Sequence, residues 1–156
     1  MSQKINLTPP LAAELDGSMP VNPLDQLLGY QLRRASVAML ADLAESLAGV
    51  GLRVTEVSVL LVIETNPDIT QSEIGRVLGI QRANMVPLTT QLERRELIHR
   101  ASSSGRAQAL RLTPAGAALA RECRERIAAH EARFLTGLDE AQRTALIAQL
   151  RQIWDR

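Results

Sequence analysis

The sequence is poor in the residues that support metal binding, cross-linking and catalysis. It has one cysteine, Cys123, in 156 residues, which excludes an intrachain disulfide and a cysteine-rich zinc site. Its two histidines, His99 and His130, argue against a conventional metal site. No nucleophile stands in a recognisable pattern with a base, and no Gly-rich phosphate loop is present. We therefore expect neither an enzyme nor a cofactor.

Aromatic residues are equally scarce, at 2% of the chain against 46% hydrophobic residues overall. A core must therefore be built from Leu, Ile, Val and Ala. No run approaches the ~18 apolar residues that a membrane helix needs. The start of the chain lacks a basic segment followed by an apolar one, so we expect no signal peptide, no membrane partner and a cytoplasmic protein.

The net charge of +1 conceals an uneven distribution. Residues 1–69 carry four Lys or Arg against eight Asp or Glu, a net −4, whereas residues 70–112 carry seven Arg against three Glu, a net +4. A local positive excess is typical of a surface that contacts phosphate groups. A solvated charged face is the alternative interpretation of this pattern.

Apolar periodicity indicates a mainly α chain with a small β-hairpin. The first helix is predicted from Asn22, as cap, to Leu47. The other predicted helices are Thr55 to about Ile63, Thr70 to Gly79, Arg82 to Leu97, Thr113 to about Leu135, and Asp139 to the end. The predicted strands are Ile98–Ala101 and Ala109–Leu112.

The segment from Thr70 to Thr113 is the most informative part of this order. It combines a short helix, whose capping box pairs Thr70 with Glu73, with a longer helix and a hairpin. This arrangement can place the second helix in a DNA major groove. Arg82, Ala83 and Asn84 would occupy the first turn of that helix, which meets base edges, and Arg and Asn suit guanine and adenine respectively. A plain helical hairpin with polar residues outside is the alternative.

The long first and fifth helices and the last helix carry more apolar surface than so small a module can cover. We expect a second copy of the chain to cover it, giving a symmetric homodimer. The predicted organisation is an N-terminal arm over residues 1–21 and a single domain over 22–156. Within it, the helix-turn-helix and hairpin cover about 53–112, and the dimerisation helices about 22–48 and 113–155.

The run Leu92–Arg100, followed by Gly105-Arg106 and by Leu110–Gly116 with its Leu-Thr-Pro-x-Gly pattern, resembles the MarR family of bacterial transcription regulators. The resemblance covers roughly residues 22–156. It implies a winged helix-turn-helix homodimer on pseudo-palindromic double-stranded DNA, most often a repressor. Many members of that family bind a small aromatic acid between the dimerisation helices and the reading module, so the resemblance implies an effector of this kind.

The resemblance implies DNA contacts residue by residue. Arg82, Ala83 and Asn84 would read bases, and Arg106 at the wing tip would enter the minor groove. We add as hypotheses further contacts of three kinds. Gln81 and Pro87 would contact DNA from the recognition helix, and Ser103 and Ser104 from the wing. The residues predicted to contact phosphates are Thr70, Gln71, Arg94 and Arg95.

Three positions depart from the family pattern. Ser104 and Gly105 replace the Asp that usually steadies the wing Arg. Glu96 stands where a Gly usually ends the recognition helix, so that end is expected to lack its left-handed cap. Pro87 lies inside the recognition helix and removes a hydrogen bond, which predicts a kink or loosening between Ala83 and Pro87. This irregularity is either tolerated or re-aims Arg82 and Asn84.

An effector site is the least specified part of the sequence. His130 is expected as a packed, hydrogen-bonded core residue, with a polar group of an effector pocket as the alternative. Gln31 and Ser36 are weaker pocket candidates. Cys123 is expected as a small buried residue rather than a redox sensor. The competing function is a helical dimeric protein-interaction module that does not bind DNA.

Overall fold

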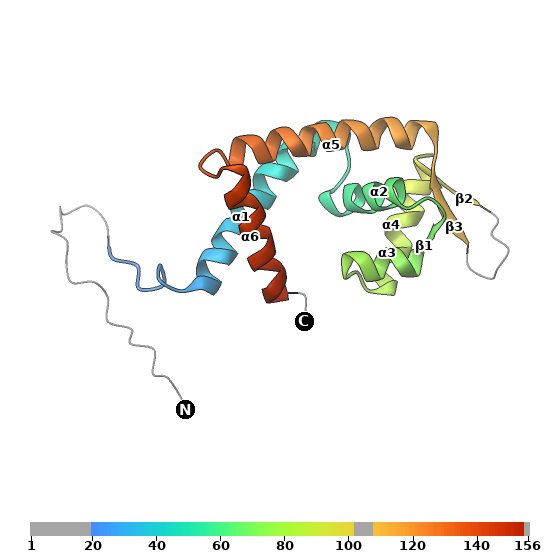
Figure 1. Cartoon of the computed structure of the whole chain (residues 1–156). Coiled ribbons are helices and arrows are strands. Elements are labelled where there is room, and N and C mark those ends of the chain that lie inside the picture. The colour runs from blue at the N-terminus through green and yellow to red at the C-terminus, as the bar shows by residue number, and fades with distance from the viewer. Residues whose placement is uncertain (1–19, 102–107, 155–156) are drawn as a thin grey trace, which may run out of the picture. The chain divides into compact units, whose positions relative to one another are not determined.

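A computed structural model describes residues 20–101 and 108–154 of the chain (Figure 1). They fall into two compact units, one that ends at Ala35 and one that begins at Ser36. The first helix, α1 (Leu28–Leu47), starts in the first unit and ends in the second. The predictions for most of the N-terminal arm and for Ser103, Ser104 and Arg106 lie outside the described residues.

In the first unit, α1 begins at Leu28, six residues after Asn22, its predicted cap. Asn22 closes a turn instead of capping the helix, since its Oδ1 accepts from the Leu24 amide at 3.1 Å and its carbonyl from the Asp25 amide at 3.2 Å. Gln31 Nε2 donates to the Asp25 carbonyl at 2.7 Å. The prediction of a helix from Asn22 is therefore wrong, because local side-chain bonding at Asn22 favours a turn.

The second unit continues from α1 through a short 3-10 turn, η1 (Ala48–Val50), and then alternates helices with strands (Figure 1). The elements in order are α2 (Val54–Thr65), β1 (Ile69–Thr70), α3 (Gln71–Leu78), α4 (Arg82–Arg94), β2 (Ile98–Ala101), β3 (Ala109–Leu112), α5 (Pro114–Phe134) and α6 (Glu140–Trp154). Among the described residues, no single helix is long and apolar enough to cross a membrane.

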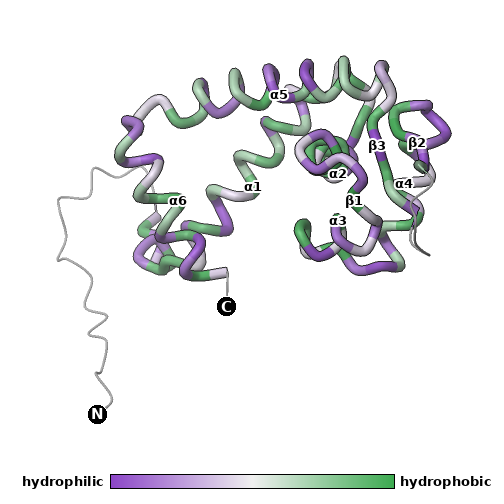
Figure 2. The backbone as a smooth tube through the Cα atoms, turned by 45° about the vertical axis from the view of Figure 1, so that its right-hand side comes forward, coloured by the Kyte–Doolittle hydropathy of each residue, from purple (hydrophilic) through white to green (hydrophobic). Residues whose placement is uncertain are grey.

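Helix α2 lies at the centre of this unit's core, as its nearly continuous apolar sequence predicts (Figure 2). Val59, Leu60 and Ile63 are at most 1% exposed and pack with Ile74 of α3, Met85 and Leu92 of α4, and residues of β3 and α5. The start of α2 is capped by Glu56, whose carboxylate accepts from the Arg53 amide at 2.8 Å. The core is aliphatic, as the shortage of aromatic residues requires.

The predicted hairpin is present with its predicted bounds, but it belongs to a three-stranded antiparallel sheet in the order β1-β3-β2. Arg100 pairs with Leu110 across the hairpin, and Ile69 of β1 pairs with Leu110 from the other side. The sequence did not reveal β1, because two residues are too few for a detectable alternation. This third strand attaches the hairpin to the turn that precedes α3.

Helix α5 begins where the Leu-Thr-Pro-x-Gly pattern predicts. Thr113 caps it by accepting from the Gly116 amide at 3.0 Å, and Pro114 occupies the first turn. Gly116 is required by a close approach, because a Cβ there would lie 1.9 Å from the Leu97 carbonyl oxygen. The glycine therefore lets the start of α5 pack directly against the end of the α4–β2 connection.

Candidate nucleic-acid interface

The second helix of the helix-turn-helix, α4, presents one face to the core and the opposite face to solvent. Met85, Thr89 and Leu92 are at most 1% exposed, at the spacing of one helical face. Ala83, Pro87 and Arg94 are exposed and, at 100° per residue, lie on the opposite side. This outer face is the part of α4 that could enter a groove of a nucleic acid.

The three residues predicted to read bases do not share one direction. Ala83 lies on the outer face, whereas its two neighbours project to opposite flanks of the helix. Arg82 lines a small pocket of about 260 Å³ beside Gln71 and Ser72 at the start of α3. Asn84 lies on the other flank, toward α2. Sequence adjacency grouped Arg82 with Asn84, but a 200° difference in helical position separates them.

Helix α4 runs from Arg82 to Arg94 without a break at Pro87. Its first turn is closed by the amides of Asn84 and Met85, both of which donate to the Gln81 carbonyl, at 2.9 and 3.1 Å. Proline leaves the Ala83 carbonyl without its usual intrahelical donor, but the flanking bonds keep the segment helical. The predicted loosening between Ala83 and Pro87 is therefore not observed as an interruption of the helix.

The end of α4 is closed by a left-handed residue, contrary to prediction. Glu96 has φ +56°, its amide donates to the Glu93 carbonyl at 2.9 Å, and the Leu97 amide donates to the Leu92 carbonyl at 3.0 Å. These two bonds are those of a Schellman motif. Thr113 Oγ1 also donates to the Glu96 carbonyl at 2.6 Å. Tertiary bonding thus holds a glutamate where glycine is usual.

The start of α3 is fixed by its predicted capping box. The Thr70 amide donates to Glu73 Oε2 at 2.8 Å, and Thr70 Oγ1 accepts from the Glu73 amide at 3.3 Å. The Thr70 amide and hydroxyl hold the pKa of Glu73 below its usual value. The amide ends of such a helix can bind a phosphate. The amide and hydroxyl of Thr70 both bond Glu73 here, and its phosphate contact stays a prediction.

Gln71, whose predicted phosphate contact stays a prediction, makes a contact inside the helix-turn-helix. Its side-chain amide donates to the hydroxyl of the buried Thr89, which itself donates to the Met85 carbonyl at 3.3 Å and the Val86 carbonyl at 3.2 Å. This chain of bonds fixes the start of α3 against the middle of α4. The angle between the two helices is consequently set in part by a polar contact.

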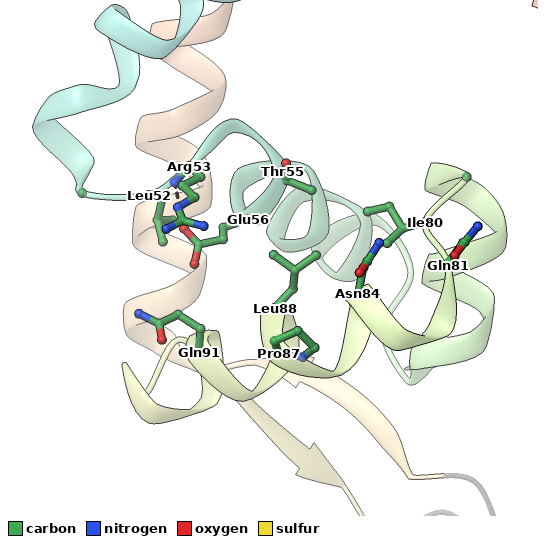
Figure 3. A pocket seen from close by; sticks show the side chains of 12 residues that line it. Leu52, Arg53, Thr55, Glu56, Ile80, Gln81, Asn84, Pro87, Leu88 and Gln91 are labelled. Carbon is green, nitrogen blue, oxygen red and sulfur yellow. Dashed lines mark hydrogen bonds between the residues drawn. The ribbon is translucent and has the colours of Figure 1, made fainter.

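A cleft of about 1050 Å³ separates α4 from the start of α2 (Figure 3). Asn84, Leu88 and Gln91 form its α4 wall, and Figure 3 shows Leu88 pointing across it toward α2. Arg53 and Glu56 belong to the opposite wall. The remaining lining residues are Gly51, Leu52, Thr55, Gly79, Ile80, Gln81 and Pro87. The lining of this cleft is about equally apolar and polar.

Of the two late arginines of the recognition segment, only Arg94 remains on the outer face. Arg94 is exposed in the last turn of α4. Arg95 turns back to the main chain after η1, and its Nη1 donates to the Gly51 carbonyl at 2.5 Å. Arg94 is thus placed for a phosphate contact, whereas Arg95 has a structural partner.

The base of the wing is held by charged pairs that the sequence did not reveal. Arg100 of β2 donates to Glu93 of α4 at 3.1 Å and to Gln108 Oε1 at 2.8 Å. Arg111 of β3 makes a two-pronged contact with Asp68 at 2.5 Å, which holds the pKa of Asp68 below its usual value. These pairs fix the described ends of the hairpin to α4 and to the α2–β1 turn.

His130 is a hydrogen-bonded core residue. It is 2% exposed, its Nδ1 lies 2.6 Å from Asp42 Oδ2, and its ring contacts that of Phe134 at a centroid distance of 5.6 Å. Arg133 donates to the same carboxylate oxygen at 2.6 Å, and both contacts lower the pKa of Asp42. A separation of 88 residues hid this pairing from sequence reasoning. Ser36 is exposed and does not line the α2–α4 cleft.

Comparison with known proteins gives the same architecture. The sequence pattern of the MarR family matches residues 52–105. The transcriptional repressor CouR bound to a 23-mer DNA duplex is 35% identical, with a TM-score of 0.80 over 87% of this chain and 98% of that chain. CouR bound to p-coumaroyl-CoA is also 35% identical, with a TM-score of 0.76 over 87% and 97%.

Two further relatives come from other bacteria. A MarR family protein of Mycobacterium tuberculosis in complex with salicylic acid is 27% identical, with a TM-score of 0.65 over 83% of this chain and 97% of that one. A putative transcriptional regulatory protein for the hcr operon of Thauera aromatica is 28% identical over 130 residues, which are 81% of this chain and 78% of that protein.

A capped short helix, a second helix with an exposed outer face and a braced antiparallel wing together define a winged helix-turn-helix DNA-binding protein. The family is equally clear from the relatives. The chain belongs to the MarR family of transcription regulators, which are not enzymes.

Proposed function

We propose that this protein is a homodimeric, sequence-specific transcriptional repressor that acts in the cytoplasm and leaves its operator when a small aromatic ligand binds. The observation that carries the proposal is the 0.80 TM-score to a repressor bound to duplex DNA, over nearly the whole length of that repressor. The exposed face of α4 and the positive charge of residues 70–112 support the same function.

The proposed dimer rests on apolar side chains that the described residues leave uncovered. Leu40 of α1 is 51% exposed, and Ile147 and Trp154 of α6 are 53% and 70% exposed. Apolar exposure on several helices is typical of an interface. Two copies related by a two-fold axis would present two α4 helices to a pseudo-palindromic operator about one DNA turn (~34 Å) apart.

DNA selection from a random pool tests this function directly. We expect the selected sequences to contain two inverted half-sites, and we expect binding to weaken steeply as salt rises, because phosphate contacts release counterions. Failure to retain any duplex would contradict the proposal and favour the protein-interaction alternative. A single unrepeated half-site would contradict the dimeric arrangement.

Two substitutions test the assignment of contacts. Arg106→Ala should weaken binding to all duplexes, because a wing arginine responds to groove shape and potential. Asn84→Ala should change the preference at one base step by about 1–3 kcal/mol, because an amide pair with adenine is base-specific. The matched control for Arg106→Ala is Arg121→Ala on α5, which also removes one arginine charge, from an exposed position. Binding by both variants equal to that of Arg121→Ala would refute these contacts.

We place the aromatic ligand in the α2–α4 cleft rather than at His130, because His130 is buried and already bonded. Leu88 and Ile80 supply apolar walls, and the guanidinium of Arg53 suits a carboxylate or a thioester oxygen. Only the Arg53 amide takes part in capping α2, so its side chain can be changed without loss of the cap.

Titration of the protein–DNA complex with salicylate and with p-coumaroyl-CoA tests the ligand site. We expect at least one of them to release the operator, because a ligand shifts an equilibrium only by differential affinity for its states. Arg53→Met should raise the ligand concentration that is needed to release the operator, whereas Arg121→Met should leave that concentration unchanged. If both variants released the operator at the same ligand concentration, the assignment of the ligand to this cleft would be wrong.

A further inference from the structure

The connection between α1 and α2 receives arginine side chains from two other helices. We call this connection, Ser46–Gly51, the joint segment. Arg126 of α5 donates from Nη1 to the Ser46 carbonyl at 3.1 Å. Arg95, at the end of α4, donates to the Gly51 carbonyl at 2.5 Å and to the Val50 carbonyl at 3.4 Å. Both guanidinium groups thus bind main-chain oxygens of the joint segment, Arg126 in the last turn of α1 and Arg95 at the end of η1.

These carbonyls need donors for a general reason. The last carbonyls of a helix have no intrahelical partner and form the negative end of its dipole. Here α1 is followed at once by η1, and Gly51 then takes φ +64° and turns the chain away. A cation with several N–H groups satisfies such an end better than a neutral residue, since it supplies both hydrogen bonds and charge.

The two glycines of the joint segment leave room for this contact. A Cβ at Gly49 would lie 3.3 Å from the Arg126 Nη1 and Nη2 atoms, and a Cβ at Gly51 would lie 3.7 Å from Arg95 Nη2. Each guanidinium therefore rests directly against bare backbone. The fit is tight at Gly49, whereas at Gly51 the spacing is that of ordinary van der Waals contact.

Each arginine is also anchored at its own end. Arg95 occupies the residue that ends α4, where the Schellman bonds of Glu96 and Leu97 fix the backbone. Arg126 is held by Glu122, one turn earlier on α5, through contacts of 2.8 and 3.0 Å. The side chain of Arg95 consequently connects the end of the recognition helix α4 to the end of η1, the turn that follows α1.

We propose that Arg95 is a positioning residue: it fixes the recognition helix to the joint segment and so sets the DNA half-site spacing that the dimer accepts. This inference rests on the proposed function of a dimeric regulator. In the dimer, α1 would belong to the dimerisation region, so a contact between α4 and η1, which follows α1 directly, transmits the geometry of the dimer to the DNA-reading surface. Arg95 then acts on DNA through its contact with Gly51, without touching the duplex.

The experiment measures affinity for operators of three lengths with full-length protein. The operator recovered by DNA selection is compared with versions in which one base pair is added or removed between the half-sites. One base pair changes the separation by about 3.4 Å and rotates one half-site by roughly 34°. A protein with a rigid joint should discriminate strongly among the three. The test quantity is the ratio of affinities between the native and the altered spacing.

Arg95→Met should lower this ratio by about threefold to tenfold, because an exposed charge-assisted contact makes a modest but measurable contribution. Arg95→Lys keeps the charge but loses the forked geometry, so it should recover only part of the ratio. Arg94→Met is the control, because Arg94 lies one residue earlier on the outer face of α4. It should lower affinity for all three operators alike and leave the ratio unchanged.

Equal ratios for the parent and Arg95→Met, with the parent binding a two-half-site operator, would overturn this inference and leave the proposed function intact. A parent protein that binds no duplex, or a single half-site only, would overturn the proposed function and this inference with it. Thermal unfolding of each variant checks that the protein is folded. Arg95→Lys provides the same comparison should Arg95→Met fail to fold.

Discussion

Gly116 gives the first prediction, because among the described glycines a Cβ added there would make the closest contact. This glycine lies in the first turn of α5, where it is buried against the carbonyl of Leu97. The substitution Gly116→Ala would place a Cβ 1.9 Å from that oxygen and 2.9 Å from the carbonyl carbon. Real Cβ atoms essentially never approach a heavy atom within 3.0 Å, so the backbone must move.

The expected cost follows from what that movement disrupts. The Thr113 amide donates to the same Leu97 carbonyl at 3.0 Å, and loss of this bond costs about 1 kcal/mol. Overpacking against backbone adds about 1–3 kcal/mol or more. Alanine in a helix returns up to about 1 kcal/mol relative to glycine. We therefore expect a net destabilisation of about 1–4 kcal/mol, or a fall in Tm of roughly 2–16 °C.

Thermal unfolding followed by circular dichroism measures this effect, with Gly137→Ala as the matched control. A Cβ at Gly137 meets no atom within 4 Å, and its φ is not in the left-handed region. We expect the control to change stability by no more than about 0.5 kcal/mol. A Gly116→Ala variant as stable as Gly137→Ala would refute the packing of α5 against Leu97.

Three further predictions concern other positions. Glu96→Gly should stabilise the protein by about 0.5–1 kcal/mol in denaturant unfolding, since glycine relieves the left-handed strain, and a loss of stability would contradict the φ of +56°. Asp68→Asn should be less stable than the parent above the usual Asp pKa of 3.8, because the Arg111 contact lowers the pKa of Asp68 in the folded state. That difference should disappear as pH falls below 3.8 through the lowered pKa, and a difference independent of pH would contradict the ion pair. Cys123 should react with a thiol reagent far more slowly in the folded than in the unfolded protein, because burial raises the pKa of its thiol, and equal rates would show an accessible thiol.

The sequence predicted the parts of the fold that depend on local signals. The Thr70–Glu73 capping box, the Thr113-Pro114 start of α5 and the limits of both hairpin strands are confirmed. Each depends on residues within a few positions of one another, so the responsible physical chemistry can be seen in the sequence. Periodicity was less dependable where a residue could face either way. On α3, the apolar Val77 is 64% exposed, whereas Ile74 is fully buried.

Contacts between distant residues could not be predicted from the sequence. Asp42 and His130 are 88 positions apart, and Arg95 and Gly51 are 44 apart. No periodicity or motif relates such positions.

By itself, the sequence determined the class of this protein, because capping, periodicity and the Leu-Thr-Pro-x-Gly pattern are local signals of a winged helix-turn-helix. The tertiary structure decided how the parts are held. It gave Glu96 its left-handed conformation, used Gln71 to brace α3 against α4, and directed Arg95 to the joint segment. The physical reason is that backbone capping is satisfied within a few residues, whereas side-chain partners are chosen only when the chain has folded.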